Sequence, residues 1–556
     1  MKKALYGLLC LLLIFAMLTG CASDASGTVS PSGDAVSGTQ PADAPARITD
    51  LTARKPNLYT IELTWTAPGN KAKSGIARSY DVRYAEQPIT AANWDACNIA
   101  DVTIFPSGAG TAEVLQVNEL QTGKTYYFGI RTTSTSNIES AISNVVSGTP
   151  ASPGERDEIT VHSLEELQAA IDGAPAAGRI ITIAKGTYHQ TERVMIENKD
   201  NITIQGETDN PADTVLIGLG IDDENMFMNM KVISSSYCTV QNLTLRDSYY
   251  HAIQIAFSAH YFRAKNLITL DNGESGFKIN ALSDYGVIEN CYIGFTSNGK
   301  REVIEGIDGI GARGWVVRGS VIENIIQLAD NIDLNVMPNY EDWIGYGIFF
   351  KANSIDCILE NNILINCDVA LSFGGSGSGS GFYRYNDETF ETRGGVMRNN
   401  IVWGTNLRAG IYVNSAKDFE IYNNTIYDDC ATGSVTFYPT NKNPNLLPSQ
   451  NGRIYNNILR YGIDLRPSRW YLPDTIDAQN NLVLEEVTAY DANGHAVSTN
   501  VLFADIFVDL ANGNFRLAPG AAAAIGKGLN LWPMVTTDIS GNPRPEKDAF
   551  SIGAYQ

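Results

Sequence analysis

The chain lacks an excess of positive charge. Its 556 residues contain 40 Lys and Arg against 61 Asp and Glu, a formal net charge of −21 at pH 7. So acidic a surface disfavours nucleic acid, and we expect no nucleic-acid partner. An acidic ligand would need a local basic site. The length is enough for two or more domains.

Cysteine is scarce and shows no metal-binding pattern. Beyond Cys10 and Cys21 there are six cysteines, at positions 97, 238, 291, 357, 367 and 430, without a CxxC pair or a dense framework. This spacing argues against a zinc site and against a disulfide scaffold. Cys238 and Cys357 fall at the same place in the repeat described below, which predicts small apolar core residues.

Long apolar runs are missing outside the N-terminus. Lys2 and Lys3 precede the apolar segment 4–17, which ends in "LTGC" at Cys21. A basic start, a short apolar run and small residues predict a signal peptide over residues 1–21. The ending resembles the bacterial lipobox. That resemblance implies a lipidated Cys21 and a protein at the cell surface, in contact with the membrane only through its lipid.

Residues 22–46 are poor in hydrophobic side chains and rich in Ala, Ser, Gly, Thr, Pro and Asp. Such a composition cannot bury a core, so we expect a flexible tether.

Residues 47–149 alternate short β-rich runs with turn signals, a pattern typical of a β-sandwich. Trp65 lies in "YTIELTWTAPG", and Leu120 precedes Tyr126 by six residues. The segment resembles a fibronectin type III domain, in which a tryptophan of the second strand is buried and a Leu…Tyr corner closes the sandwich. The resemblance implies a spacer or a weak binding module.

A different organisation begins near residue 156, where an apolar-x-Asn pattern repeats. Successive members are separated by 24, 24, 29, 42, 38, 24, 33 and 24 residues, which a unit of 24 with four insertions explains. The members are Asn242, Asn266, Asn290, Gly319, Asn361, Asn399, Asn423, Asn456 and Asn480. A fixed period of this length indicates a solenoid.

The units contain short strands and no helical periodicity, so the solenoid over 156–556 is predicted to be a parallel β-helix of about ten coils. Asparagine tolerates left-handed backbone angles, and its amide can bond the equivalent residue one coil away. "HSLEELQAAIDGA" reads as an amphipathic helix with Ser163 and Glu166 at capping-box spacing. We expect this helix to cap the N-terminal end of the core. The fold class is therefore all-β, a sandwich followed by the β-helix.

Several segments resemble secreted bacterial right-handed parallel β-helix proteins of the pectate-lyase-like superfamily. They are "HAIQI" (251–255), "GIDGIGARGWVVRG" (306–319), "YGIFF" (346–350) and the closing stretch from "GNFRLAPG" to "SIGAYQ". That superfamily includes pectate, alginate and chondroitin lyases, polygalacturonases and phage tailspikes. The resemblance implies a polysaccharide ligand without fixing the reaction.

Strand alternation predicts which side chains point outward from the coils. Stacking them in register gives one column of Gln254, Lys278, Asp308, Phe349, Ser372, Tyr412, Thr436 and Asp464. The next outward position adds Asn280 and Lys351. We expect these side chains to face solvent about 5 Å apart.

The insertions are expected to wall a groove over this column. One of them, 374–395, joins a glycine-serine run to aromatic residues and to Arg384 and Arg393. Such a loop suits either a lid over a sugar chain or a plain surface loop. Gln254, Asn280, Phe349, Lys351, Arg384 and Arg393 are the predicted substrate-binding residues.

A uronate lyase needs a cation beside the substrate carboxylate, a base for the neighbouring carbon and an acid for the leaving oxygen. Lys278 suits the cation, because Asp308 one coil away would keep it protonated and so disfavours it as a base. Asp308 is a further catalytic candidate, and Tyr412 or His251 are candidates for the acid. The alternative for Lys278 and Asp308 is a surface ion pair of little energetic value.

Two other functions stay open. A glycoside hydrolase needs two facing carboxylates, for which Asp308 and Asp333 are the pair available. A non-catalytic glycan-binding or adhesion protein is favoured by Ile310 and Phe349, which stand where related proteins tend to carry histidines. Polygalacturonase motifs are absent from the sequence. Residues 221–225, or Asp330 with Asp333, are possible calcium ligands, and we assign no metal site. We expect a monomer.

Overall fold

The computed structural model describes residues 44–57, 59–100, 106–118, 120–150, 156–296, 305–326, 345–375, 380–404, 409–428, 433–437, 443–464, 470–484, 497–498 and 506–556. Cys21, Asp330, Asp333 and the tether up to residue 43 lie outside these ranges. Much of the sequence of the insertions that were expected to wall a groove also lies outside these ranges.

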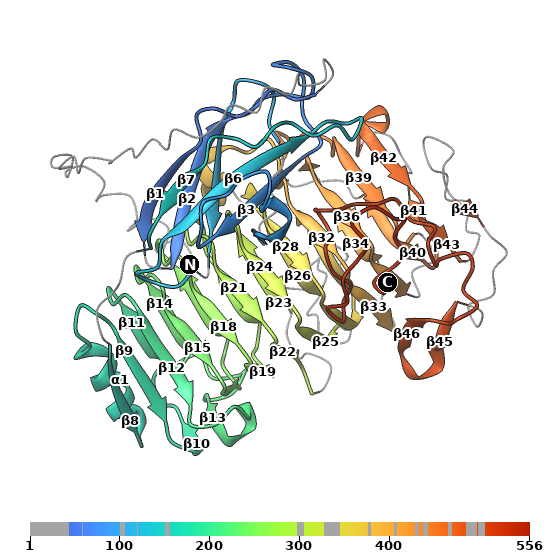
Figure 1. Ribbon diagram of the computed structural model, residues 1–556. Coiled ribbons are helices and arrows are strands. Elements are labelled where there is room, and N and C mark those ends of the chain that lie inside the picture. Colours follow the sequence, from blue (N-terminus) through green and yellow to red (C-terminus); the bar gives the residue numbers. More distant parts are fainter. Residues whose placement is uncertain are drawn as a thin grey trace. The chain divides into compact units, whose positions relative to one another are not determined.

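Residues 52–148 form two antiparallel sheets (Figure 1). One contains β1 (Thr52–Asn57), β2 (Thr60–Thr66) and β5 (Ala112–Val117); the other contains β3 (Ser79–Ala85), β4 (Asn98–Ile99), β6 (Tyr126–Thr133) and β7 (Val146–Gly148). Trp65 is buried edge-on against Tyr80, with ring centroids 5.1 Å apart. The hydroxyl of Tyr126 accepts a hydrogen bond from the backbone N of Gln121 at 3.2 Å. These contacts fit the predicted sandwich, and membership of the fibronectin type III family stays a prediction.

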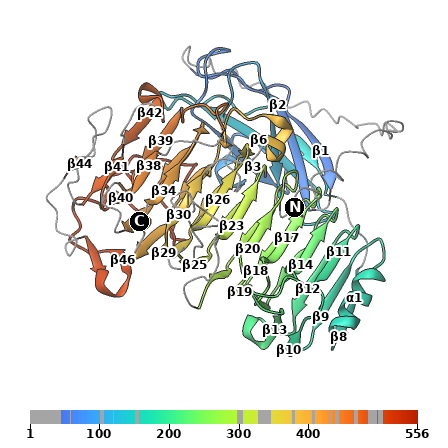
Figure 2. The same cartoon turned by 180° about the vertical axis from the view of Figure 1, so that it is seen from behind.

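The remaining chain coils through three long parallel sheets, whose strands stack side by side from α1 onward (Figures 1 and 2). The first sheet has ten strands in the described residues: β11 (Val194–Glu197), β14 (Met228–Ile233), β17 (His251–Ala256), β20 (Ser275–Ile279), β23 (Glu305–Ile310), β26 (Tyr346–Lys351), β30 (Val369–Phe373), β34 (Ala409–Val413), β38 (Val435–Phe437) and β41 (Ile463–Asp464).

The second sheet contains β10 (Gly186–His189), β13 (Thr214–Ile217), β16 (Thr244–Arg246), β19 (Ile268–Leu270), β22 (Tyr292–Gly294), β25 (Val321–Ile325), β29 (Ile363–Cys367), β33 (Ile401–Gly404), β37 (Thr425–Asp428), β40 (Ile458–Leu459), β43 (Leu482–Val483) and β44 (Val497–Ser498). The third contains β8 (Asp157–Val161), β9 (Arg179–Ile183), β12 (Ile202–Gly206), β15 (Thr239–Gln241), β18 (Arg263–Lys265), β21 (Val287–Glu289), β24 (Val316–Arg318), β28 (Ile358–Glu360), β32 (Val396–Arg398), β36 (Glu420–Tyr422), β39 (Gly452–Tyr455) and β42 (Ile476–Gln479). A short parallel sheet adds β27 (Ser354–Ile355), β31 (Thr392–Arg393) and β35 (Ala416–Lys417).

This topology confirms the predicted fold class, an all-β chain in which a sandwich is followed by a parallel β-helix. The ten strands of the first sheet agree with about ten coils. The interior is one continuous apolar core that includes Cys238 and Cys357. All five described cysteines are buried and none forms a disulfide.

Helix α1 (Leu164–Asp172) covers the N-terminal end of this core. Ser163 is its N-cap: its side chain accepts from the backbone N of Glu166 at 3.1 Å, while Glu166 accepts from the backbone N of His162 at 2.7 Å. This is the predicted capping box. Leu167 and Ile171 on the opposite face are fully buried in the core.

The asparagines of the 24-residue repeat adopt the left-handed conformation. All nine members, Gly319 included, have φ between 50° and 60°. The amide-to-amide bonds predicted between coils occur where Asn266 donates to Asn242 at 2.8 Å and Asn456 donates to Asn423 at 3.5 Å. Asn242, Asn399 and Asn480 instead donate to Asp209, Thr537 and Lys527.

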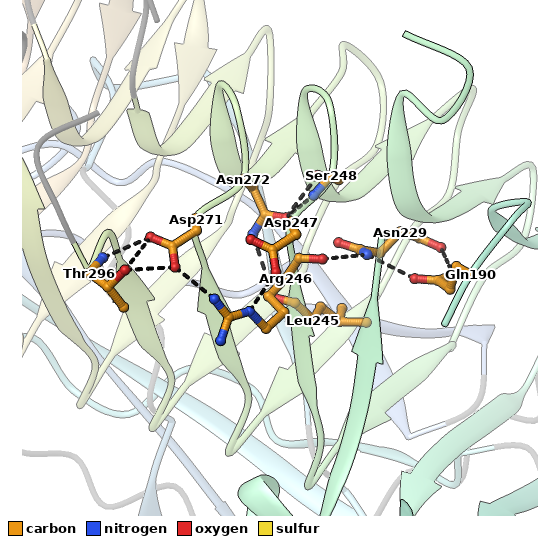
Figure 3. Close-up of polar contacts among 9 residues, drawn as sticks. All are labelled: Gln190, Asn229, Leu245, Arg246, Asp247, Ser248, Asp271, Asn272 and Thr296. Atoms are coloured by element: carbon orange, nitrogen blue, oxygen red, sulfur yellow. Dashed lines mark hydrogen bonds and ion pairs between the residues drawn. The ribbon is translucent and has the colours of Figure 1, made fainter. Parts of the chain in front are cut away.

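A second, interior ladder begins one residue later in the C-terminal coils. Asn362, Asn400, Asn424, Asn457 and Asn481 are buried, and each of the first four donates its amide to the side-chain oxygen of the next, at 2.9–3.1 Å. In the N-terminal coils, buried polar pairs such as Gln190 with Asn229, and Ser248 with Asn272, lie instead where the chain passes from the second sheet to the first (Figure 3). These contacts give the buried turns the hydrogen bonds that they need.

The C-terminal segment, 506–556, lies against the outer asparagines. It contains β45 (Phe507–Asp509) and β46 (Asn514–Leu517), which pair antiparallel. The amides of the last four outer members donate to its backbone carbonyls at 2.7–3.0 Å: Asn399 to Thr537, Asn423 to Ser551, Asn456 to Leu529 and Asn480 to Lys527. The repeat thus holds the end of the chain as well as its own coils.

Candidate functional site

The outward face of the first sheet carries two columns of side chains. Strand pairing places Gln254 beside Lys278, Lys278 beside Asp308, and Asp308 beside Phe349, as predicted. A second column, three residues earlier in each strand, runs through His251, Ser275, Glu305 and Tyr346. The sequence did not reveal this second column.

Two lysines from different coils meet at one carboxylate. Lys278 on β20 pairs with Oδ2 of Asp308 on β23, and Nζ of Lys351 on β26 lies 3.5 Å from Oδ1 of Asp308. Nζ of Lys278 is also 3.7 Å from Oε1 of Glu274. Glu305 bonds Asp308 through its side chain. We call Glu274, Lys278, Glu305, Asp308 and Lys351 the charged cluster.

Asp308 and Glu305 are the buried members of the cluster, and the two lysines and Glu274 are partly exposed. The side chain of Asp308 is 0% exposed, whereas the side chains of Lys278, Lys351 and Glu274 are 15%, 19% and 23% exposed. The expectation that the whole column faces solvent is therefore wrong for most of its members, which are buried: Asp308, Phe349, Ser372, Tyr412, Thr436 and Asp464. The physical reason is that these side chains pack against their neighbours, as Phe349 does on Tyr346, with ring centroids 4.4 Å apart.

Burial and the lysines drive the pKa values of two neighbouring carboxyls apart. Burial raises the pKa of Glu305 well above its ordinary range, and the negative charge of Asp308 raises it further. Burial also acts to raise the pKa of Asp308, but the ammonium groups of Lys278 and Lys351 outweigh it, so that the pKa of Asp308 is lowered. Of these two neighbouring carboxyls, Asp308 therefore loses its proton the more readily.

The same charges fix the state of Lys278. Burial acts to lower its pKa, yet the carboxylates of Asp308, Glu305 and Glu274 raise it overall. Lys278 thus stays an ammonium ion at neutral pH. Burial raises the pKa of Glu274, which makes this partly exposed carboxylate a stronger base than an ordinary one.

The environment of His251 does not favour the predicted role as the general acid. Its Nδ1 lies 2.8 Å from the hydroxyl of Ser275. Burial, and then the positive charge of Lys278, lower the pKa of His251 to about 3, so the ring is neutral at pH 7. Tyr412 lies on β34, four strands beyond Lys278, which is about 19 Å at the usual spacing.

The remaining predicted binding residues fall into two groups. Gln254 donates to Asn280 at 2.9 Å, and both lie half-buried beside Lys278. Nζ of Lys351 lies 4.3 Å from the ring centroid of Phe349, which fixes the ammonium against an aromatic face. These four belong to the same face as the cluster.

Arg384 and Arg393 have other partners. Arg384 is 3% exposed and forms a two-pronged ion pair with Asp284, both N–O distances being 2.8 Å. Arg393 pairs with Asp387 at 2.6 Å. A guanidinium already held in this way is less available to a substrate than the lysines are.

Glu274 and Glu305 are the residues that sequence reasoning missed. Glu274 directly precedes β20 and Glu305 is the first residue of β23, where strict alternation gives no information about direction. A usable signal was the three-residue spacing of His251 and Gln254, which recurs in Glu305 and Asp308.

No group of three or more His, Cys, Asp or Glu side chains is arranged to hold a metal ion in the part of the chain that the structure describes. Over the same residues, no helix is long and apolar enough to cross a membrane. The lysines and carboxylates of the site can bind an anion through two oriented ammonium groups and can transfer a proton to Glu274.

No family model matches the chain, and no curated protein matches it. Among solved structures, an alginate lyase from Paenibacillus sp. str. FPU-7 aligns at 17% identity over 49% of this chain and 95% of its own, with a TM-score of 0.34. The pectate lyase Pel9A aligns at 13% identity over 73% and 98%, with a TM-score of 0.40. A Family 28 exopolygalacturonase of Yersinia enterocolitica aligns at 12% identity over 81% and 93%, with a TM-score of 0.34. The assignment of the parallel β-helix rests on the strand pairing of the chain itself.

Proposed function

We propose that the outward face of β17–β26 binds an acidic polysaccharide and cleaves it by β-elimination. The observation that carries this proposal is the convergence of Lys278 and Lys351 on the buried Asp308, with the open carboxylate of Glu274 beside them. Asp308 orients both ammonium groups from below and is itself out of reach of a substrate.

Lys278 and Lys351 supply the positive charge that is needed beside the substrate carboxylate. Two oriented ammonium groups can hold one uronate carboxylate and stabilise the negative charge that develops when the neighbouring carbon loses its proton. The raised pKa of Lys278 supports this role and argues against its use as the base.

Glu274 supplies the base in this proposal. It takes the proton from the carbon beside the substrate carboxylate, a carbon–carbon double bond forms, and the bond to the glycosidic oxygen breaks. The proton on Glu274 then passes to the leaving oxygen, so that one carboxylate serves both steps. The buried positions of His251 and Tyr412 make them weaker candidates for the acid.

The proposal is tested with a panel of uronate polymers, following the ultraviolet absorbance of the unsaturated product. We expect Glu274→Gln to retain binding and to lower the rate about a hundredfold or more, because the amide cannot accept the proton. Lys278→Ala should weaken binding about tenfold or more. Lys265→Ala, an exposed lysine on β18, is the matched control and should behave as wild type.

Absence of product from every polymer, with binding still sensitive to Lys278→Ala, would support the alternative of a non-catalytic glycan-binding protein. That alternative is favoured by Ile310 and Phe349, both buried apolar residues at positions where a histidine would add chemistry. Release of reducing ends without an unsaturated product would instead indicate a hydrolase.

We also propose that the protein is held at the cell surface through a lipid on Cys21. The support is the "LTGC" ending of the N-terminal apolar run. Metabolic labelling with a fatty acid analogue should mark the wild type and not Cys21→Ser. Equal labelling of both would contradict the proposal.

A further inference from the structure

A partly exposed group of aromatic rings lies one strand away from the charged cluster. Phe227 precedes β14, and Tyr249 and Tyr250 precede β17. The ring centroids of Phe227 and Tyr250 are 5.5 Å apart in a stacked arrangement, and those of Tyr249 and Tyr250 are 4.6 Å apart, edge to face. We call these three residues the aromatic patch.

The patch is partly open to solvent although it is largely apolar. Phe227 is 41% exposed, between the buried Met226 and Met228, and Tyr249 and Tyr250 are half-buried. Exposed aromatic clusters of this kind mark places where a ligand or partner binds. Aromatic rings offer a flat apolar surface, and tyrosine adds a polar end. A pyranose ring, with its C–H face and its rim of hydroxyls, matches both features.

Main-chain contacts tie the patch to the candidate site. The carbonyl of Tyr250 accepts from the backbone N of Glu274 at 2.7 Å and from that of Ser275 at 2.9 Å. The ring of Tyr250 lies 5.8 Å from that of His251. The patch is therefore about one strand spacing, roughly 4.8 Å, from the coil that carries Glu274 and Lys278. That distance is comparable to one sugar residue of a polysaccharide.

The charge near the patch selects against an acidic sugar. The loop that leads into Phe227 carries Asp222, Asp223 and Glu224, and two of these, Asp222 and Glu224, are exposed. A carboxylate placed there would meet like charge, whereas a neutral sugar would not.

We propose that Phe227, Tyr249 and Tyr250 form a subsite that stacks on a neutral pyranose residue, next to the acidic residue held by Lys278. The substrate is then a polysaccharide in which uronate and neutral sugars are neighbours. This inference rests on the proposed function for the position of the acidic residue, and the aromatic subsite itself is tested separately.

Calorimetric titration of the full chain with neutral hexaoses tests the subsite. The probes are β-1,4-, β-1,3- and α-1,4-linked glucose hexaoses. We expect at least one to bind, and Phe227→Ala and Tyr250→Ala each to weaken that binding about tenfold. Phe257→Ala is the matched control, because Phe257 is 63% exposed and lies at the other end of β17. It should leave the affinity unchanged.

Binding of none of the hexaoses, or binding that survives both substitutions at the patch, overturns the subsite. Unchanged melting temperatures of the variants show that a loss of binding is local. Hexagalacturonate with Lys278→Ala tests the charged cluster independently. A negative result there contradicts the proposed function and leaves the measurement at the aromatic patch valid.

Discussion

At the scale of single residues, the candidate site depends on one buried anion. Asp308 is fully buried and its pKa is lowered by Lys278 and Lys351, while the pKa of Glu305 beside it is raised well above its ordinary range. Opposite shifts in two neighbouring carboxyls are a common sign of a functional site. They also make the stability of the protein depend on pH in a definite direction.

Glu305→Gln should change that dependence. The folded protein keeps a proton on Glu305 at pH values where the unfolded chain has released it, above about pH 4.3. The free energy of unfolding therefore falls as pH rises, by up to about 1.4 kcal/mol per pH unit, until the raised folded pKa is passed. Glutamine has no proton to lose and can still donate to Asp308.

Urea unfolding at a series of pH values checks this prediction. The variant and the wild type should have similar stability near pH 4, and the variant should become the more stable of the two toward neutral pH. Parallel curves for the two proteins would show that Glu305 is ionised in the folded state.

Single residues also show which parts of the candidate site could be predicted from the sequence. The 24-residue period correctly placed Lys278 beside Asp308, because pairing in a parallel sheet preserves the repeat. Glu274 and Glu305 were not found, because the chain bends at the start of each strand. Ala252 and Ile253, two consecutive residues, are both fully buried, which breaks the alternation used to assign direction. The burial of Asp308 was not predicted, because the 24-residue period shows which residues lie side by side and gives no information on how closely their side chains pack.

At the scale of elements, the turns between sheets are held by two asparagine ladders with different physical roles. The outer members need a left-handed backbone, which glycine also provides, as at Gly319. The inner members are buried amides that satisfy backbone groups of two coils. Asn424 donates to Met397 O at 2.9 Å and accepts from the backbone N of Asn400 at 2.9 Å. The sequence revealed the outer ladder through its backbone requirement, and the hydrogen bonds of the inner one could be seen only with the coils stacked.

Asn424→Ala and Asn290→Gly should separate these roles. The first leaves buried polar groups on Met397 and Asn400 without partners and should lower the free energy of unfolding by about 3 kcal/mol or more. The second keeps the required φ of 54° and should cost less than about 1 kcal/mol. Denaturant unfolding of both variants measures the difference, and equal losses would mean that the two ladders contribute in the same way.

At the scale of the whole molecule, stacked coils interact mainly with their neighbours, so each end of the core needs its own cover. Helix α1 provides one through Leu167 and Ile171, and its capping box and apolar face made it predictable. The docking of the C-terminal segment was not predictable in detail. One of its contacts is made by Arg544, which is 2% exposed and donates to Asn399 Oδ1 at 3.0 Å, a contact between residues 145 positions apart in the chain.

Arg544→Met should release the C-terminal segment without unfolding the distant coils. Besides Asn399, the guanidinium donates to the carbonyls of Gly553 at 3.0 Å and Ser551 at 3.2 Å, and burial lowers its pKa to about 10. Methionine fills similar space but leaves these acceptors without their donor, at a cost of about 3 kcal/mol.

Amide hydrogen exchange of the variant checks this prediction. It should become faster over 526–556 and stay unchanged in β9 to β14, because a loss of stability in one coil passes only to the coils that contact it. Arg516→Met is the control, because Arg516 lies in the same segment and is exposed. Faster exchange in β9 to β14 would show instead that the β-helix opens as one cooperative unit.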